Sequence, residues 1–191
     1  MRGQTELVRL LYDPVSYYRP WRRAVAGLSA GQRSGLNAQL IRQHHLPGYD
    51  TPITSQRWLV DRLVNAWHVL PSAAFLMACA KLRSAVAADR GYLAQPPVVH
   101  AFMRLGFTEQ MTRVVPAVDT ASLLGWGGHY LQALAPRLPA WLGTRLALPF
   151  AGLSPTLADP ARPRFEPDLT CFWSALTYAA NDTELVGRLR D

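Results

Sequence analysis

Apolar side chains recur with the period of an α-helix along residues 55–70. They fall every three or four residues on one face, at Leu59, Leu63, Trp67 and Leu70, with Val60 and Val64 beside them. The polar side chains of this segment share the opposite face, as expected for a helix packed on a core. Ser55 supplies an N-cap, and Pro71 is expected to end the helix.

A second helix is predicted from its N-cap, Ser72, to Asp89, just before Gly91. Its first half is apolar on every side, which is typical of a helix buried at the centre of a protein. Cys79 within it is expected to pack as a small hydrophobic side chain.

Weaker helical patterns follow along the rest of the chain. They are expected at residues 97–105, from Thr108 onward, at 119–134 with Asp119 as N-cap, at 139–148, and from Pro167 with Phe172 and Tyr178 inside. Three glycines within 119–134 (Gly125, Gly127 and Gly128) must permit close packing or mark a bend. Residues 151–167 hold four prolines and are predicted to form an irregular loop. Since no alternating strand pattern is sustained, the sequence predicts an all-α fold, a compact single-domain helical array over residues 1–191.

Composition narrows the class of protein. Apolar residues make up 49% of the 191 residues and charged residues 17%, which argues against a chain disordered throughout. The longest central apolar run, Ala73–Ala80, is far shorter than the roughly 20 residues that a membrane span needs. No small-residue cleavage site follows the apolar residues near the N-terminus, so no signal peptide is expected. Two widely separated cysteines favour a reduced, cytoplasmic protein over a disulfide scaffold.

The charge is uneven along the chain. Of the 20 basic residues 19 are arginines, a bias so general that arginine abundance alone says little about nucleic acid. Residues 1–42 carry seven arginines against two acidic residues, whereas residues 165–191 carry two arginines against five acidic residues. A basic first part and an acidic last part predict a polarised surface that meets a charged partner.

One short motif resembles that of a catalytic serine. Gly27–Gly31 reads GLSAG and matches G-x-S-x-G, in which a strand delivers the nucleophilic serine into a tight turn before a helix. Here the preceding residues look helical and no sheet is predicted. Ser29 with Gln32 instead has the pattern of a capping box for a helix through His44.

Other residues capable of chemistry form no recognisable site. The segment Gly125–Gly128 reads GWGG and lacks the last glycine of G-x-G-x-x-G, because Tyr130 stands there. The five histidines contain no H-E-x-x-H pattern and the two cysteines no C-x-x-C pattern, so zinc is not expected. Glu166 and Asp168 lie close together on the proline-rich loop and are expected to be solvated or capping. The sequence therefore predicts no catalytic residue, no cofactor and no metal site.

Aromatic and basic side chains are interleaved near the N-terminus. This aromatic–basic cluster comprises Tyr17, Tyr18, Arg19, Trp21, Arg22 and Arg23. In one interpretation the rings pack inward and the arginines are solvated. In the second the cluster is a protein interface, where these residue types are enriched, and in the third it binds nucleic acid through phosphate contacts and base stacking. We take the protein interface as the candidate site and a basic helical nucleic-acid-binding module as the alternative.

Five segments of the chain match a known pattern in order. Tyr12–Pro20 reads YDPVSYYRP, and Trp67–Arg83 contains LP followed by FLMACAKLR. Leu123–Leu134 comes next, then Leu138-Pro139 with RLALPF at Arg145–Phe150, and finally Leu176–Ala179. These segments resemble those of the OrgA/MxiK family, also called SctK, whose members are accessory proteins of the type III secretion injectisome.

The resemblance implies a non-enzymatic adaptor in the cytoplasmic sorting platform of the injectisome. Such proteins join the cytoplasmic domain of the inner-membrane ring protein to the platform's pod protein. The pods in turn carry the stator and the export ATPase and help to load substrates for secretion. The chain would then be peripheral at the cytoplasmic face of the inner-membrane apparatus, with protein partners, no nucleic acid and no direct insertion into the membrane.

Overall fold

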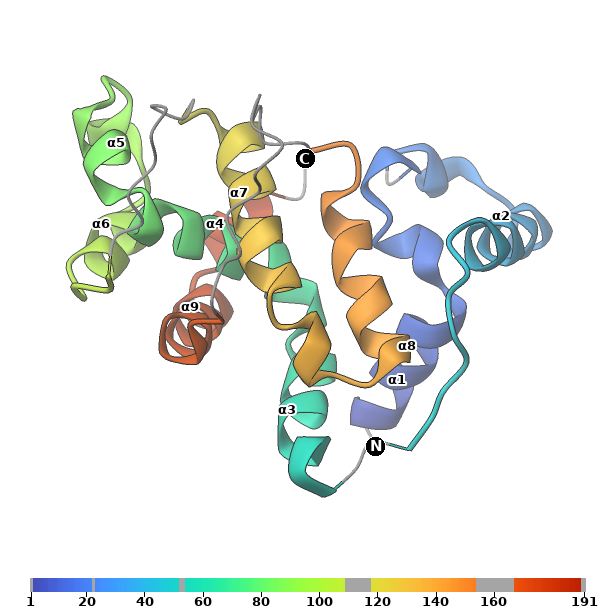
Figure 1. Ribbon diagram of the computed structural model, residues 1–191. Coiled ribbons are helices and arrows are strands. Elements are labelled where there is room, and N and C mark those ends of the chain that lie inside the picture. The colour runs from blue at the N-terminus through green and yellow to red at the C-terminus, as the bar shows by residue number, and fades with distance from the viewer. Residues whose placement is uncertain (1, 22, 52–53, 109–117, 154–166, 190–191) are drawn as a thin grey trace, which may run out of the picture. The chain divides into compact units, whose positions relative to one another are not determined.

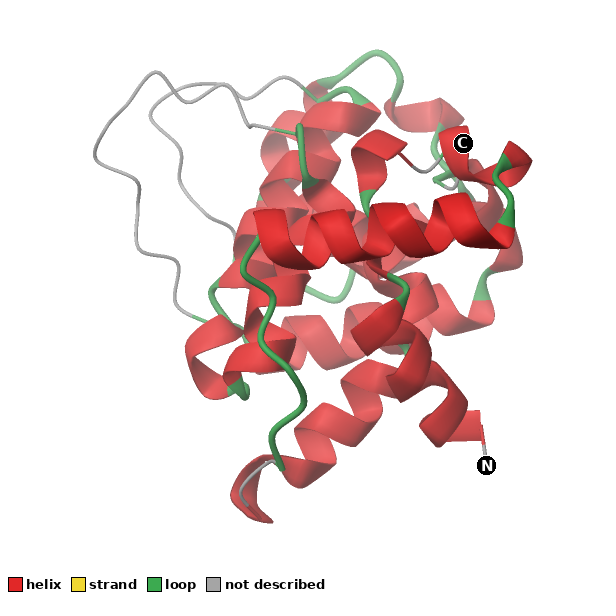
Figure 2. Ribbon diagram, turned by 90° about the vertical axis from the view of Figure 1, so that its right-hand side faces the viewer, coloured by secondary structure: helices red, strands yellow, loops and turns green. Residues whose placement is uncertain are grey.

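The fold is taken from a computed structural model that describes residues 2–21, 23–51, 54–108, 118–153 and 167–189. All regular structure in these ranges is helical, and they contain no strand (Figure 2). The all-α prediction is thus confirmed.

Two compact units make up the chain, and each is built from two separate stretches of sequence. Unit 1 consists of Met1–Trp67 and Leu134–Gly152, and unit 2 consists of His68–Ala133 and Leu153–Asp191. The chain therefore passes between the units three times. The expectation of a single domain over residues 1–191 stays a prediction.

Unit 1 combines α-helices with short 3₁₀ turns (Figure 1). Its α-helices are α1 (Arg2–Tyr12), α2 (Ala30–Gln43), α3 (Thr54–Asn65) and the short α8 (Ala140–Gly143). Its 3₁₀-helices are η1 (Pro14–Ser16), η2 (Arg19–Trp21), η3 (Ala24–Gly27), η6 (Ala135–Arg137) and η7 (Thr144–Phe150). In this unit α1 packs against α3 and η1, and α8 packs against η6 and η7.

The start of α2 follows directly from its sequence. The Ser29 hydroxyl accepts a hydrogen bond from the Gln32 backbone N–H, and the Gln32 side chain accepts one from the Ser29 backbone N–H. This arrangement confirms the predicted capping box, and His44 forms the C-cap of the helix. The Ser29 hydroxyl is thus engaged at a helix N-terminus, and no strand precedes it as a nucleophile elbow requires.

The helix predicted from Ser55 is α3, and its buried face is the expected one. The four apolar side chains expected on that face within α3 (Leu59, Val60, Leu63 and Val64) are buried. The helix ends at Asn65, however, and a 3₁₀ turn, η4 (Trp67–Val69), follows it. The predicted continuation to Leu70 is therefore wrong.

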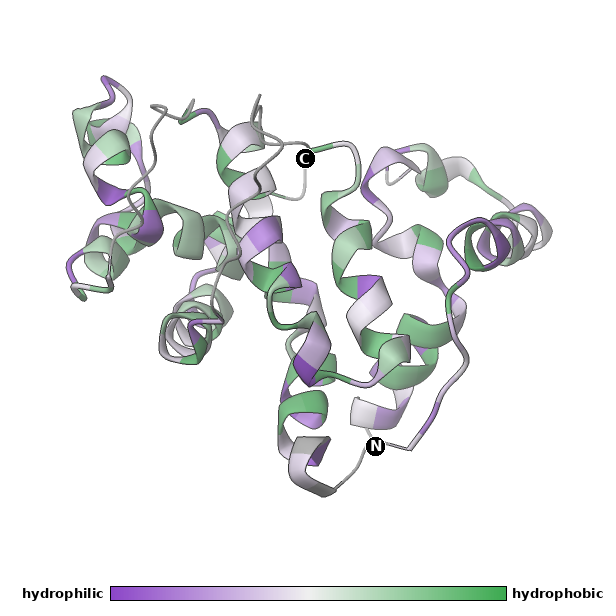
Figure 3. Ribbon diagram, in the orientation of Figure 1, coloured by the Kyte–Doolittle hydropathy of each residue, from purple (hydrophilic) through white to green (hydrophobic). Residues whose placement is uncertain are grey.

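Unit 2 is built around α4 (Leu70–Lys81), which is buried from Ser72 to Ala80. The helices that pack against it are α5 (Arg83–Ala88), α6 (Pro97–Met103), α7 (Thr120–Gln132), α9 (Leu169–Asn181) and α10 (Thr183–Arg188). A 3₁₀ turn, η5 (Tyr92–Ala94), joins α5 to α6. The apolar colouring of α4 in Figure 3 reflects its central place, which confirms the predicted buried helix.

The start of α4 corrects the expectation for Pro71 and Ser72. Pro71 lies in the first turn of α4 instead of ending the preceding helix, and Ser72 is buried inside α4 instead of capping it. Proline is tolerated there because the first N–H groups of a helix have no partner within that helix. Since α4 ends at Lys81, the single helix predicted to Asp89 is in fact two helices, α4 and α5.

Several other helices lie near their predicted bounds. Asp119 caps α7 by accepting a 2.9 Å hydrogen bond from the Ser122 N–H. The helix expected at 97–105 is α6, and the one expected at 139–148 is α8 followed by η7.

The last predicted helix begins slightly later than expected. The Asp168 carboxylate accepts the Cys171 N–H at 2.9 Å, so α9 starts after Asp168 and not at Pro167. This contact confirms capping as the role of Asp168. The helix predicted beyond Thr108, and most of the proline-rich segment 151–167, lie outside the described residues.

No single helix in the described ranges is long and apolar enough to cross a membrane. One bent pair, Arg57–Asn65 with Trp67–Lys81, reaches that length and composition only when its two parts are taken together. The more apolar part of this pair is α4, whose apolar side chains form the core of unit 2.

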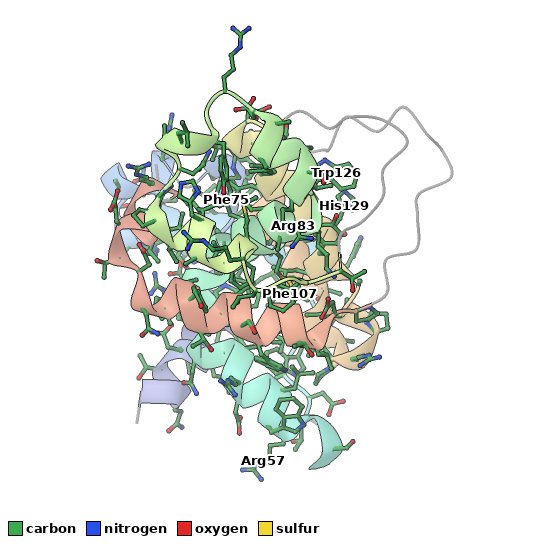
Figure 4. The ribbon with its side chains drawn as sticks, turned by 90° about the vertical axis from the view of Figure 1, so that its left-hand side faces the viewer. Arg57, Phe75, Arg83, Phe107, Trp126 and His129 are labelled. Atoms are coloured by element: carbon green, nitrogen blue, oxygen red, sulfur yellow. The ribbon has the colours of Figure 1, made fainter. Side chains whose placement is uncertain are left out.

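The helices α4 and α7 approach each other closely at Gly127. A Cβ atom on Gly127 would overlap the backbone of Ala74, including its carbonyl oxygen. Close packing, one of the two expected reasons for glycine in this helix, thus applies at this position. Figure 4 labels Phe75 on α4 and Trp126 on α7, the sequence neighbours of the two residues in contact.

Gly127→Ala is expected to lower the free energy of unfolding by roughly 1–3 kcal/mol, because the added methyl group forces α7 away from α4. Urea unfolding of both proteins measures this difference. Gly187→Ala in α10 is the control, since a Cβ atom there meets open space and should slightly raise stability through helix propensity. Equal stability of Gly127→Ala and wild type would contradict the close approach.

The chain's single lysine forms an ion pair in unit 2. The Lys81 ammonium lies 2.5 Å from the Asp168 carboxylate and donates a 3.1 Å hydrogen bond to the Thr108 carbonyl. Burial raises the pKa of Asp168, but hydrogen bonds from the Cys171 backbone and from Lys81 outweigh this effect. The pKa is therefore lowered overall from its ordinary value of 3.8.

Acidification is expected to remove the contribution of this ion pair to stability. A carboxylate whose pKa is lower in the folded than in the unfolded state stabilises the protein above the unfolded value. That stabilisation is lost as the pH falls through the folded-state pKa. Asp168→Asn should therefore be less stable than wild type at neutral pH, and the difference should narrow below about pH 4, near the ordinary pKa. Thermal unfolding over a pH series measures it, and a difference independent of pH would contradict the assignment.

Candidate protein-binding site

A network of polar side chains joins the end of α1 to α2. The Asp13 carboxylate accepts hydrogen bonds from the Arg33 guanidinium at 3.0 and 2.6 Å and from the Asn37 amide at 3.0 Å. The Asn37 side-chain oxygen accepts the Val15 backbone N–H at 2.9 Å. Because Val15 and Asn37 are buried, these bonds replace hydration that the buried groups have lost. The network fixes α2 against η1.

The charge of Asp13 is set by this network. Burial raises the pKa of Asp13, but the hydrogen bonds from Arg33 and Asn37 favour the ionised carboxylate and lower the pKa overall. In return, the hydrogen bond to Asp13 raises the pKa of Arg33. Both side chains are therefore charged at neutral pH, and each offsets the charge of the other.

Two tyrosines of the aromatic–basic cluster are engaged in internal contacts. The Tyr17 hydroxyl donates a 2.6 Å hydrogen bond to the Leu10 carbonyl, and its ring meets the Trp67 ring edge-on with centroids 5.5 Å apart. The Tyr18 ring contacts Trp21 and His44, with centroid distances of 5.4 and 5.3 Å. These contacts hold the aromatic half of the cluster within unit 1.

The two arginines of the cluster that the structure describes lie at the surface. Arg19 and Arg23 are exposed, and Trp21 is half-buried between them. Arg22 lies outside the described residues. The structure thus brings the rings of Tyr18 and Trp21 together, leaves Arg19 and Arg23 exposed, and engages the Tyr17 hydroxyl with the α1 backbone.

Arg145 is a buried cation in unit 1, with only 2% of its surface exposed. Its guanidinium donates hydrogen bonds to three backbone carbonyls, those of Trp141 at 2.6 Å, Pro47 at 2.9 Å and Leu11 at 3.2 Å. These carbonyls belong to α8, to the segment after α2 and to α1. One side chain therefore ties three parts of unit 1 together.

Arg145 and Tyr17 also influence each other electrostatically. Burial raises the pKa of the Tyr17 hydroxyl far above its ordinary value, and the Arg145 guanidinium opposes this shift. Burial lowers the pKa of Arg145, and Tyr17 opposes that shift. The Tyr17 hydroxyl therefore stays protonated, which lets it donate its hydrogen bond to Leu10.

Local sequence patterns do not reveal the residues that organise this part of unit 1. Arg33 and Asn37 make their contacts across at least 20 positions, and Arg145 makes two of its three across 98 and 134 positions. None of them stands in a pattern with a chemical signature. One signal exists for Arg145, because it precedes an almost wholly apolar run, Leu146–Phe150. Both Asp13 and Arg145 also lie within segments that carry the family resemblance.

The described residues offer no grouping suited to a metal ion. Within them no three histidine, cysteine, aspartate or glutamate side chains gather closely enough to hold one. The two cysteines, Cys79 and Cys171, are both buried, and burial raises the pKa of each thiol. A raised thiol pKa disfavours the thiolate that nucleophilic chemistry requires.

The family model for the bacterial type III secretion apparatus protein OrgA_MxiK matches residues 7–181. The chain belongs to this family. It is also 26% identical over 174 residues to the oxygen-regulated invasion protein OrgA of Salmonella typhimurium, in strains 14028s, SL1344 and LT2. The match covers 90% of this chain and 85% of OrgA. No solved structure matches the chain.

Membership of the OrgA_MxiK family gives the site its general context. The family description names a component of a secretion apparatus and not a catalyst. The matched residues include the network around Asp13, the aromatic–basic cluster and Arg145. The chain is therefore a type III secretion apparatus protein, and its exposed residues are considered below as contacts within that apparatus.

Arg145→Met is expected to destabilise the protein by at least about 3 kcal/mol, since three carbonyls lose their donor and an unpaired buried carbonyl costs about 1–3 kcal/mol. Urea unfolding measures the loss. Arg137→Met, at an exposed arginine of the same unit, is the matched control and should change stability by less than about 0.5 kcal/mol. Similar values for the two variants would mean that the Arg145 hydrogen bonds contribute little.

Proposed function

We propose that this protein is a non-enzymatic adaptor of the cytoplasmic sorting platform of the type III secretion injectisome. It links the cytoplasmic domain of the inner-membrane ring protein to the pod protein, which connects it indirectly to the stator and the export ATPase. In this role it is required for platform assembly and protein secretion, and it is peripheral at the cytoplasmic face of the inner membrane. Family membership and the resemblance of its five segments support this assignment.

The observation that carries the linking role is the division of charge between the two units. Unit 1 contains eleven arginines and four acidic residues, a net charge of +7, whereas unit 2 contains nine basic and nine acidic residues. The formal net charge of the whole chain, +7, thus belongs to unit 1. Two bodies that differ so much in charge suit two partners with different surface charge.

Within unit 1 we assign the contact with an acidic partner to the aromatic–basic cluster. Exposed arginines such as Arg19 and Arg23 increase the rate of encounter with an acidic surface. Trp21 adds an apolar contact and is held in place by its packing on Tyr18. Tyr17 anchors this segment to α1 through its hydrogen bond to the Leu10 carbonyl.

Charge alone also permits the alternative, a basic module that binds nucleic acid. Binding through phosphate contacts weakens steeply as salt concentration rises and depends little on sequence. The two functions therefore predict different binding partners for the purified chain, a nucleic acid in one case and a protein of the secretion apparatus in the other. Titration against a nucleic-acid duplex at two salt concentrations tests the alternative beside the protein partners.

Reversing two arginines of the cluster is expected to weaken one protein complex. The double variant Arg22→Glu/Arg23→Glu should bind either the ring-protein domain or the pod protein roughly tenfold more weakly, a loss of about 1.4 kcal/mol. The difference should shrink at high salt, because salt screens exposed charges. Titration of wild type and variant against each partner separately, at two salt concentrations, measures both effects.

The matched control reverses two exposed arginines of unit 2. Arg90→Glu/Arg104→Glu changes the net charge of the chain by the same amount and should leave the affected complex unchanged. Circular dichroism of each variant verifies that the helical fold is retained. Equal affinities of wild type and Arg22→Glu/Arg23→Glu for both partners would remove the cluster from the interface.

A further inference from the structure

Helix α2 has little support from the rest of the described chain. Only η1 packs substantially against it, and its buried residues are Asn37 and Leu40. Both ends of the helix are nevertheless firmly fixed. The capping box of Ser29 closes its start, and the Leu46 N–H donates back to the Ile41 carbonyl at its end. In Figure 1 α2 lies at the edge of unit 1.

The end of α2 adopts a conformation that usually requires glycine. His45 has a positive φ of 46°, and its N–H donates to the Arg42 carbonyl, as in a Schellman motif. Burial of the next residue, Leu46, holds this left-handed turn in place. α2 is therefore a preformed helix whose exposed face needs no rearrangement to receive a partner.

Small side chains follow one side of α2, next to the exposed glutamines of this helix. They recur at helical spacing at Ala30, Gly31, Ser34, Gly35 and Ala38. A Cβ atom on Gly31 or Gly35 would meet no other atom within 4 Å, so no packing inside the described chain requires glycine there. Glycine destabilises a helix interior relative to alanine, and the space that it leaves permits a second backbone to approach closely.

Three of these residues, Ala30, Ser34 and Ala38, line an open groove of about 470 Å³ between α2 and the end of α1, whereas Gly31 and Gly35 are not among its lining residues. Tyr12 forms one wall, and Ala30, Ser34, Ala38 and Ile41 form the other. Tyr12 is 65% exposed, and Val8, one turn earlier on the same face of α1, is 52% exposed. The groove thus has one wall of mostly small residues from α2 and one exposed aromatic side chain, Tyr12, from α1.

The basic residues near the groove favour an acidic partner over a second copy of this chain. Arg9 is exposed on α1 next to Val8, and Arg42 is exposed near the end of α2. The acidic residue in the groove wall, Asp13, is already neutralised by Arg33 and Asn37. A second copy of the chain would bring the same +7 charge of unit 1 to the contact, which opposes self-association.

We infer that the groove between α1 and α2 binds an acidic amphipathic helix of a partner protein. The apolar face of that helix lies on the small residues of α2 and against Tyr12, and its acidic residues meet Arg9 and Arg42. Helices pack at short interaxial distances where the side chains at their contact are small. Recognition of an amphipathic helix by an apolar groove is a general mode of protein binding. The inference rests on the proposed function in that the partner is a component of the sorting platform.

The test fills the groove without changing any charge. Ala30 and Ser34 line the groove and are exposed, and glutamine is a good helix former. Ala30→Gln/Ser34→Gln should therefore unfold at a temperature close to that of wild type while its longer side chains block the groove. Gly187→Gln in α10, where a Cβ atom meets open space, is the control for a glutamine placed outside the groove. The probe is a fluorescein-labelled peptide of about 18 residues, long enough for five helical turns. It carries glutamates on one face and alanine with leucine on the other.

Fluorescence anisotropy at two salt concentrations measures binding of this peptide to the full chain. Wild type and Gly187→Gln should bind it equally, and the α2 variant should bind it at least tenfold more weakly. A peptide of the same composition in scrambled order should bind poorly, because its acidic and apolar residues share no faces. Equal binding of the scrambled peptide, undiminished binding to the α2 variant, or no binding to wild type would overturn the inference.

Two further measurements separate this inference from the adaptor role. If wild type bound the peptide but neither the ring-protein domain nor the pod protein, the adaptor role would fail and the groove would stand. If a protein partner bound wild type and the α2 variant equally, the adaptor role would stand and the groove would be excluded from that complex. Sedimentation of the free chain covers the remaining occupant, since a wild-type dimer that the α2 variant abolishes would assign the groove to a second copy.

Discussion

A buried arginine joins three segments of unit 1, and its partners among the described residues are backbone carbonyls and not carboxylates. The guanidinium of Arg145 is planar and its donors point in fixed directions, so the three carbonyls that it binds must converge on it. Backbone dipoles here replace the water that a cation would lose on burial. One of these carbonyls, that of Leu11, lies in the last turn of α1. Arg145 therefore also helps to position the turn at Tyr12–Ser16 and the network around Asp13. The surfaces that we assign to partner binding are thus built on an interior polar constraint and not on apolar packing alone.

Sequence patterns predict the features of this protein that depend on residues close together in the chain, and they miss those that depend on distant residues. The capping box of Ser29, the cap at Asp119 and the buried face of α3 are encoded within a few residues, and all are found as expected. The expectation that Pro71 ends a helix is wrong, because a proline fits equally well after the end of one helix and in the first turn of the next. Helix α1 was not predicted, since an apolar stretch interrupted by Arg9 carries no cap signal.

The candidate site illustrates the same distinction. Composition alone does not decide whether a tyrosine beside arginines faces solvent or the interior. For Tyr17 the answer depends on the Leu10 carbonyl and the Trp67 ring, which only the folded backbone brings near. Asn37 likewise belongs to no recognisable sequence pattern, although its side chain accepts a hydrogen bond from the buried Val15 N–H and holds α2 in place. Residues whose role is to join distant segments carry no periodic signature, so they are the ones that sequence patterns miss.

The interleaved construction of the two units has a consequence for the order in which the chain folds during synthesis. The Leu11 carbonyl and Arg145 are 134 positions apart, so the first helices of unit 1 leave the ribosome long before the side chain that joins them exists. Meanwhile α4 and α7 of unit 2, which lie within one continuous stretch, are complete and able to pair. Contacts between residues so distant in sequence close slowly because of the chain entropy that they remove. The arginine-rich N-terminal part of unit 1 therefore stays incompletely packed until Leu134–Gly152 has been synthesised. A fragment that stops before Leu134 lacks the residues that complete this unit.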